Sequence, residues 1–297
     1  MGRALRLLLI AIVTGNAVVA STVPAPAAEA GCTPGEPVDD REIVANPNGP
    51  YYHQVRIGTM ADGVVQGDQL LADHASVPDA VTLEDGDIAV YFVNGAKNIM
   101  ARGVFDGEGL LHDRRAVVID GVKGGSAVDP DVIRLPDGTI RLAYFNGFGP
   151  PDPEQDHVMC IADSTDGIHF ESVGEIFRGT DLTDPSLTVH DGVWYLAVSH
   201  GTESYIARSD DGLEFEQVAT VLGGVPEITT GDDGSLHLYV CEQRGVVHLT
   251  SHDGVTWTGS DSVLPPGTCD PSVVVDTDSF VYKTFATRAP RPPSPPG

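Results

Sequence analysis

Acidic side chains flank prolines at five places along this chain, and they are the residues best suited to chemistry. The five segments are Val77-Pro78-Asp79, Asp129-Pro130-Asp131, Asp184-Pro185-Ser186, Val225-Pro226-Glu227 and Asp270-Pro271-Ser272. Carboxyl groups that gather in one site repel each other, which raises the pKa of some of them and lets them hold a proton at neutral pH. One protonated and one ionised carboxyl group can act together as general acid and general base.

The spacing of these segments predicts what brings them together. The five prolines recur at intervals of roughly 40 to 55 residues, about the length of one β-propeller blade. Each proline begins a short apolar run, and four of the five runs end at an Asp-Gly turn, which favours a β-hairpin. We therefore expect each proline to start the inner strand of a blade.

A second repeat marks the outer strands. Residues 164–170, 209–215 and 251–257 share the pattern Ser-x-Asp-Gly-x-x-aromatic. In such a turn the Ser and Asp side chains bond backbone amides, while Gly takes a positive φ. The pattern resembles the Asp-box of sialidases and other propellers, one residue shorter, and we interpret it as structural.

The order of the repeats predicts how the ring closes. One outer hairpin, at residues 52–60 and 64–70, precedes the first inner strand, and none follows the last inner hairpin, at residues 272–285. The N-terminal strands must therefore complete the last blade, which removes the open edges of a linear array. We predict an all-β fold, a single five-bladed β-propeller over residues 31–287 whose ring is closed by the N-terminal strands.

The two ends of the chain predict where the protein acts. Arg3 and Arg6 precede an apolar stretch, and Ala28-Glu29-Ala30 fits a cleavage site, so residues 1–30 are expected to be a signal peptide and the protein to be secreted. A lipid anchor attached to Cys32 is the alternative. Glu29, however, stands where a lipoprotein signal has an aliphatic residue. Residues 288–297 are Pro-rich and expected to be disordered.

The cysteines fit the same compartment. A secreted chain with four cysteines can form two disulfides in three connectivities. We expect the pair Cys241–Cys269, because both residues fall on one face of the ring. Cys32 and Cys160 are the other two, and one bridge with free buried thiols is the alternative.

Charge limits the partners. A formal net charge of −26 repels nucleic acid and anionic membranes. Neutral sugars, cationic ligands and Ca²⁺ remain open as binding partners. The acidity also has a simpler explanation, since it keeps an exported protein soluble. We expect a monomer that binds carbohydrate and has no nucleic-acid or membrane partner.

The starts of the inner strands and the loops after the second strands open on one face of a propeller. Residues two apart in a strand point the same way, so the residues on both sides of each proline are expected to face this mouth. The expected substrate-binding residues are Asp129, Asp131, Asp270, Asn94, Asn146, His200, Glu242 and Arg244, with Gln243 beside them. Residues 147–156 form a Gly/Pro loop that could serve as a lid or pocket wall.

This plan resembles the five-bladed propeller glycoside hydrolases, namely the arabinanase/β-xylosidase family 43 and, more distantly, the invertase-like family 32. Asp184-Pro185-Ser186 is similar to the Asp-Pro-Ser strand start of family 43. The resemblance implies an inverting glycosidase with Asp79 as base, Asp184 as the residue that tunes a pKa, and Glu227 as acid. Asp79 and Glu227 follow their prolines, whereas the family has Asp-Pro and Glu-Gly-Pro.

Two other enzymatic interpretations are weaker. Residues 45–49 are similar to the nucleophile motif of family 32, but Asn46 replaces the nucleophilic Asp, and a plain turn is the preferred interpretation. Sialidases bind their substrate's carboxylate with three arginines, and no inner strand start carries an arginine. Arg244 alone does not make that site.

Non-catalytic functions also stay open. A glycan-binding or surface propeller would carry the same repeats, and Asp before Pro can serve the scaffold by bonding a backbone amide. Acid–base hydrolysis requires no cofactor. Carboxylates on the axis, with His200 or water, could hold one Ca²⁺ or Na⁺, and a water-filled channel is the alternative.

Overall fold

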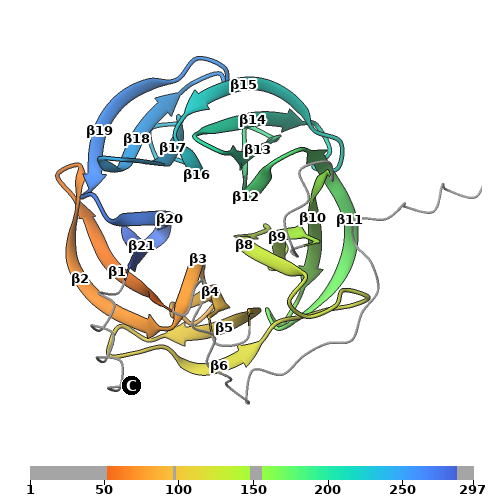
Figure 1. Cartoon of the computed structure of the whole chain (residues 1–297), viewed down its shortest axis with the longest axis vertical. Coiled ribbons are helices and arrows are strands. Elements are labelled where there is room, and N and C mark those ends of the chain that lie inside the picture. The colour runs from red at the N-terminus through yellow and green to blue at the C-terminus, as the bar shows by residue number, and fades with distance from the viewer. Residues whose placement is uncertain (1–51, 96–97, 148–155, 286–297) are drawn as a thin grey trace, which may run out of the picture.

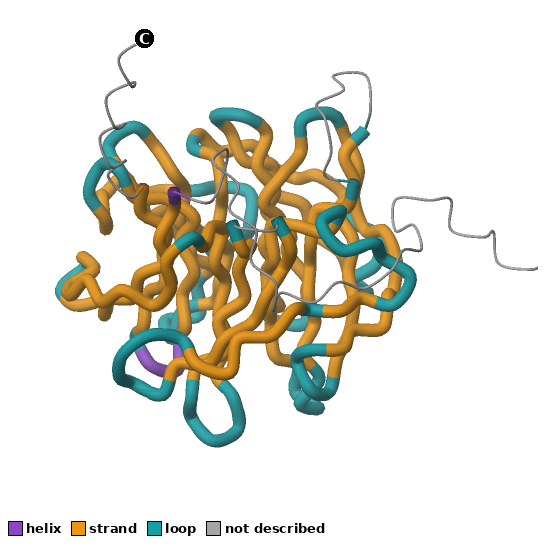
Figure 2. Tube along the Cα trace, turned by 60° about the horizontal axis from the view of Figure 1, so that its bottom comes forward, coloured by secondary structure: helices purple, strands orange, loops and turns teal. Residues whose placement is uncertain are grey.

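The protein is described by a computed structural model, in which residues 52–95, 98–147 and 156–285 are placed. Over these ranges five sheets stand radially around a central axis (Figure 1). The strands run between the two faces of the ring, and the loops gather on those faces (Figure 2). The predicted all-β fold, a five-bladed propeller, is confirmed.

Each blade is one sheet that extends outward from the axis. Blade 1 contains β3 (Ala75–Thr82), β4 (Ile88–Asn94), β5 (Ile99–Phe105) and β6 (His112–Ala116). Blade 2 contains β8 (Ala127–Arg134), β9 (Ile140–Asn146), β10 (His157–Ser164) and β11 (His169–Gly179), with the short β7 (Val118–Ile119) parallel to β11. Blade 3 contains β12 (Leu182–His190), β13 (Val193–His200), β14 (Glu203–Ser209) and β15 (Glu216–Leu222). Blade 4 contains β16 (Gly224–Thr230), β17 (Leu236–Glu242), β18 (Gly245–Ser251) and β19 (Thr258–Leu264).

Blade 5 joins the two ends of the described chain. It contains β20 (Thr268–Val274), the 3-10 helix η2 (Val275–Thr277), β21 (Ser279–Phe285), β1 (His53–Ala61) and β2 (Val64–Asp73). The sheet order is β2-β1-β21-β20, and β1 pairs with β21 from His53↔Phe285 to Thr59↔Ser279. The orange and blue strands therefore lie side by side in Figure 1. The prediction that the N-terminal strands complete the last blade is confirmed.

The middle strands of the blades are buried on both faces because each blade packs between two others. All residues of β4 and β5 are buried, whereas most of β6, at the rim, is exposed. One buried cluster joins Tyr91 of blade 1 to Leu142 and Phe170 of blade 2. Such double burial explains why these strands are near-continuous apolar runs.

The outer turns hold their shape with their own side chains. In the turn at residues 251–257, Ser251 Oγ accepts from Gly254 N–H at 2.9 Å, and Asp253 Oδ1 accepts from Val255 N–H at 2.8 Å. Gly254 has a φ of 70°, and a Cβ there would lie 2.3 Å from the Tyr195 ring. The same bonds recur in the turns at residues 164–170 and 209–215. These turns serve the scaffold and lie at the end of the blades opposite to the starts of the inner strands.

Cys241 and Cys269 form a disulfide between blades 4 and 5, as expected. Cys32, the segment 1–30, residues 45–49 and the tail 288–297 lie outside the described residues, as does most of the loop 147–156. No helix in the described ranges is long and apolar enough to cross a membrane.

Candidate active site

Each inner strand bends at its proline. The residue before the proline has a φ between 48° and 54° in all five blades, in the left-handed region that non-glycine residues seldom adopt. The pairing with the second strand shifts at the same point, so the bend is a β-bulge. We call these five residues the mouth ring: Val77, Asp129, Asp184, Val225 and Asp270.

This conformation is unfavourable, above all for Val77 and Val225, whose β-branched side chains disfavour a positive φ. A residue held in such a region costs on the order of 1–3 kcal/mol, and such residues cluster at ligand-binding and catalytic sites. The bends therefore mark the mouth of the ring as the place to look for function.

The residue after each proline connects its blade to the next one. Its side chain accepts a hydrogen bond from the backbone N–H that lies two residues beyond the next blade's proline. We call these residues the latch ring; the bonds are Val132 N–H to Asp79 Oδ2 (2.5 Å), Leu187 N–H to Asp131 Oδ2 (2.8 Å), Ile228 N–H to Ser186 Oγ (3.0 Å), Val273 N–H to Glu227 Oε1 (3.1 Å) and Ala80 N–H to Ser272 Oγ (3.0 Å). The bonds close a circle around the axis. Because serine makes the same bond in two blades, the latch alone does not require a carboxylate.

The mouth ring, the five prolines and the latch ring except Ser272 line one pocket on the axis. The space that the centre of a water molecule can occupy in it is ≈ 20 Å³, enough for about one water. All six carboxyl groups expected at the mouth meet here: Asp79, Asp129, Asp131, Asp184, Glu227 and Asp270. The pocket thus brings together acidic groups from all five blades.

The predicted loop residues lie at the same face but do not line this pocket. Asn94, Asn146 and His200 end the second strands β4, β9 and β13, opposite the first residues of the inner strands. Glu242 and Arg244 form an exposed ion pair with each other at 2.8 Å. These side chains surround the mouth at a greater distance from the axis.

Three carboxylates of the latch ring converge. Asp79, Asp131 and Glu227 each offer one oxygen, and these oxygens lie within 4.8 Å of one another. Burial raises the pKa of Asp79 to about 6. Burial and then the charge of Asp79 raise the pKa values of Asp131 and Glu227 well above their usual range. Burial therefore favours the protonated forms of the three groups, and their oxygens could instead hold a cation.

In the mouth ring two carboxyl groups have raised pKa values. Burial and then the charge of Asp270 raise the pKa of Asp184 to about 6. Burial and then the charge of Asp184 raise the pKa of Asp129 well above its usual range. The backbone N–H of Asp184 lies 3.4 Å from Asp129 Oδ2, and Thr183 Oγ1 donates to Asp184 Oδ2 at 2.6 Å. The pKa values of Asp129 and Asp184 are thus both raised, and these two side chains are less deeply buried than the carboxyl groups of the latch ring.

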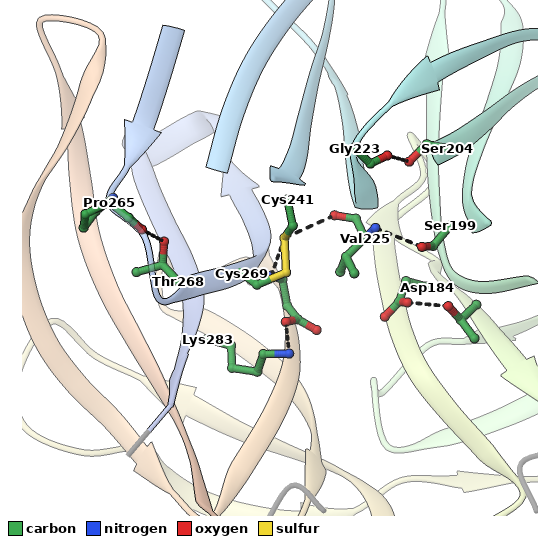
Figure 3. The surroundings of a disulfide bond; sticks show 12 residues. Asp184, Ser199, Ser204, Gly223, Val225, Cys241, Pro265, Thr268, Cys269 and Lys283 are labelled. Carbon is green, nitrogen blue, oxygen red and sulfur yellow. Dashed lines mark hydrogen bonds and ion pairs between the residues drawn. A yellow bond between two sulfur atoms is a disulfide. The ribbon is translucent and has the colours of Figure 1, made fainter. Parts of the chain in front are cut away.

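A buried lysine, absent from the sequence-based expectations, completes the mouth. Lys283 Nζ forms an ion pair with Asp270, and the two side chains are 11% and 3% exposed. Burial by itself would lower the pKa of Lys283, but the charges of Asp270, Asp184 and Asp129 raise it overall. Figure 3 shows Lys283 near the Cys241–Cys269 bridge, with Asp184 on the other side. A charged residue in the largely apolar segment 280–285 was the signal that could have revealed it.

The distance between Asp79 and Glu227 bears on the expected mechanism. Inverting glycosidases separate their two carboxyl groups by about 6.5–9.5 Å to hold a water molecule, and retaining ones by about 5–5.5 Å. The Asp79 and Glu227 oxygens lie within 4.8 Å. Asp79 and Glu227 therefore lie on the same side of the ring, with these oxygens closer together than either separation.

The fold is shared with solved glycoside hydrolases. A thermostable family-43 glycoside hydrolase has a TM-score of 0.56 and 14% identity, covering 74% of this chain and 95% of that chain. An α-L-arabinanase of Penicillium chrysogenum, solved with arabinobiose, has a TM-score of 0.51 and 16% identity, covering 74% of this chain and 75% of that chain. An exo-β-1,3-galactanase of Phanerochaete chrysosporium has a TM-score of 0.52 and 11% identity. The match covers 77% of this chain and 64% of that chain.

Sequence comparison adds a shorter match. The sucrose-6-phosphate hydrolase of Bacillus subtilis (strain 168) is 29% identical over 90 residues, which are 29% of this chain and 18% of that protein. The match thus spans less than a fifth of that relative's length. No protein-family model matches the chain. The resemblance to the five-bladed propeller glycoside hydrolases is borne out in the architecture of the chain.

Proposed function

We propose that this protein is a glycosidase that cleaves a glycosidic bond with carboxyl groups of the axial pocket as general acid and general base. The observation that carries the proposal is the gathering of six carboxyl groups in one pocket, several with raised pKa values. Glycoside hydrolysis needs one carboxyl group that is protonated at working pH and one that is ionised. Family-43 enzymes built on the same fold support the choice of reaction.

The acid and the base are best assigned to the mouth ring. Asp129, whose pKa is raised well above its usual range, is the proton donor, and Asp184, with a pKa of about 6, is ionised above that pH. Neighbouring groups whose environments push their pKa values apart are the usual arrangement of an acid and a base. Both side chains are more accessible than Asp79 and Glu227, which are held by latch bonds.

An alternative assignment keeps the same reaction but makes Asp79 and Glu227, the pair expected from the sequence, the two catalytic carboxyl groups. Their closeness suits a nucleophile and an acid of a retaining enzyme better than an inverting pair. The two assignments differ in which substitutions remove turnover, so mutagenesis separates them.

The substrate is proposed to be a carbohydrate outside the cell. The Cys241–Cys269 disulfide fits an oxidising compartment. The strongly acidic chain disfavours polyanionic substrates. Neutral polysaccharides or oligosaccharides are therefore the proposed substrate class.

A hard cation is proposed for the deep carboxylates. Ca²⁺ binds oxygens at about 2.3–2.6 Å, so oxygens up to roughly 5 Å apart can share one ion. The oxygens of Asp79, Asp131 and Glu227 meet this condition. The ion would neutralise the carboxylates beneath the mouth and take no part in the bond-breaking step.

A non-catalytic glycan-binding propeller is the second candidate. The observation in its favour is that Val77 and Val225 occupy the mouth ring in blades 1 and 4, where other blades have Asp. Blades 1 and 4 thus contribute no carboxyl group to the mouth ring.

The deciding experiment is a screen of aryl-glycosides and neutral polysaccharides with the wild type and four variants: Asp129→Asn, Asp184→Asn, Asp79→Asn and Glu227→Gln. An enzyme of the proposed kind loses turnover by orders of magnitude in the first two variants while their melting temperatures are kept. If only Asp79→Asn and Glu227→Gln lose turnover, the catalytic residues belong to the latch ring instead. Binding without turnover in the wild type supports the second candidate instead.

A further inference from the structure

We propose that Phe285, His53 and Lys283 form a sugar-binding subsite at the rim of the axial pocket, between blades 5 and 1. The ligand is a neutral sugar ring that places its apolar face on Phe285 and its hydroxyl groups on His53 and Lys283. The inference rests on the proposed action on carbohydrate, and it names the residues that hold a sugar unit beside the carboxyl groups.

Phe285 provides the apolar platform. It is the last residue of β21, and 59% of its surface is exposed, whereas the neighbouring Lys283 is buried. The His53 ring meets it edge-on at 4.9 Å, and Lys283 Nζ lies 5.4 Å from its centroid. An exposed aromatic ring bordered by a few fixed polar groups is the usual composition of a small-molecule site.

His53 is held so that one ring nitrogen is available. Its Nδ1 forms a 2.7 Å hydrogen bond with Ser76 Oγ at the start of blade 1, and its strand pairs it with Phe285. Among the described residues no group bonds Nε2. Burial and then the charge of Lys283 lower the pKa of His53, so the ring is neutral at pH 7. A neutral imidazole can exchange a hydrogen bond with a sugar hydroxyl.

Lys283 links the platform to the pocket. Its ammonium has three donors, of which Asp270 takes one, and Asp270 itself lines the axial pocket. Because Asp270 balances the charge of Lys283, the subsite carries no net positive charge. The nearby ionised carboxylate of Asp184 repels anionic sugars. A neutral sugar is therefore the class that fits.

The test is calorimetric titration of the full chain with three probes, arabinopentaose, xylopentaose and β-1,3-galactotriose. Phe285→Ala should weaken the binding of the best probe roughly 3- to 10-fold, the usual contribution of an aromatic contact. Phe285→Tyr should keep the affinity of the wild type, and His53→Phe should weaken it by a similar factor. Leu222→Ala is the matched control, because Leu222 is 71% exposed at the end of β15, the outer strand of blade 3.

Binding is measured separately from turnover, so two failures can be told apart. If the wild type binds a probe and Phe285→Ala binds it equally well at an unchanged melting temperature, the subsite is wrong while the proposed function stands. If the wild type binds none of the probes and hydrolyses none, both are overturned. The subsite would also be overturned if Leu222→Ala weakened the binding of the probe as much as Phe285→Ala does.

Discussion

Ser186 Oγ donates a hydrogen bond to Glu227 Oε2 at 2.9 Å, across the junction between blades 3 and 4. The same hydroxyl accepts from Ile228 N–H at 3.0 Å, and Glu227 Oε1 accepts from Val273 N–H of blade 5 at 3.1 Å. Glu227 thus bonds both neighbouring blades at once. A residue that the sequence nominates for catalysis is therefore also part of the scaffold, and its two roles need separate tests.

The first prediction separates these roles. Glu227→Ala leaves Val273 N–H without its acceptor, and a buried donor left unsatisfied costs about 1–3 kcal/mol. Glu227→Gln keeps an amide oxygen for that bond and should lower the free energy of unfolding by less. Urea denaturation of both variants, with Glu203→Ala as a control outside the latch ring, checks the difference. Equal losses for Ala and Gln would show that the carboxylate charge, not the latch bond, stabilises the ring.

The second prediction concerns pH. The folded pKa of Asp79 and of Asp184 is about 6, above the ordinary value of 3.8, so the folded state binds more protons than the unfolded state between these values. The free energy of unfolding should therefore fall as pH rises from about 4 to 7, by on the order of 1.4 kcal/mol per pKa unit for each group. Urea midpoints measured across this range provide the check.

Asp184→Asn should flatten that pH dependence, because the variant has no proton to lose at this position. Asp191→Asn, at a carboxyl group that is 92% exposed, should leave the dependence unchanged. A wild-type stability that rises steadily from pH 4 to pH 7 would contradict the prediction.

The third prediction concerns the buried ion pair. Lys283→Met removes the partner of Asp270 and leaves its carboxylate buried without compensation. Such a change destabilises by about 3–5 kcal/mol, whereas Lys283→Met combined with Asp270→Asn should recover much of that loss. Thermal unfolding of the single and double variants measures the recovery. If the double variant is no more stable than Lys283→Met, the loss of stability does not come from breaking the ion pair.

The fourth prediction concerns the disulfide. Cys241 and Cys269 are 28 residues apart in sequence, and replacing both with serine should cost about 3–4 kcal/mol, mainly by freeing the unfolded chain. Because Cys269 adjoins Asp270, the substitution should also shift the pH dependence of any turnover. Unfolding midpoints with and without reductant, and pH–rate profiles of the variant, check both effects. A wild type that is indifferent to reduction would contradict the first of them.

The fifth prediction concerns the deep carboxylates. Ca²⁺ should raise the melting temperature of the wild type, and chelator should lower it, because an ion that binds only the folded state stabilises it. The effect should grow between pH 6 and pH 8, since binding requires Asp79, Asp131 and Glu227 to lose their protons. Asp131→Asn should abolish the response. A melting temperature that neither treatment changes rules the ion out.

The sequence predicted the blades well because their signals are local. Asp-Gly turns, apolar runs and the repeated prolines each depend on a few adjacent residues, and their order alone showed that β1 and β2 belong to the last blade. It also predicted that all six carboxyl groups meet on the axis. These conclusions need only the repeat and the direction of each strand.

The depth of each side chain could not be predicted in the same way. The expectation treated the residues on both sides of a proline as equivalent, because residues two apart in a regular strand point the same way. The positive φ at Asp129 and Asp184 breaks that regularity and separates a mouth ring from a latch ring. Lys283 was missed because its partner Asp270 comes from a different strand, and the register of that pairing is a property of the folded sheet.

The pairing of β1 with β21 also affects how the chain reaches its folded state. The first two strands leave the ribosome early, yet their partner is the last strand of the described chain. Until β21 is made, β1 and β2 can form only a two-stranded hairpin with an unpaired edge, and such edges promote aggregation. Folding should therefore be slow, as expected for contacts between distant segments. Truncation just before residue 279 should yield insoluble protein rather than a stable four-bladed fragment.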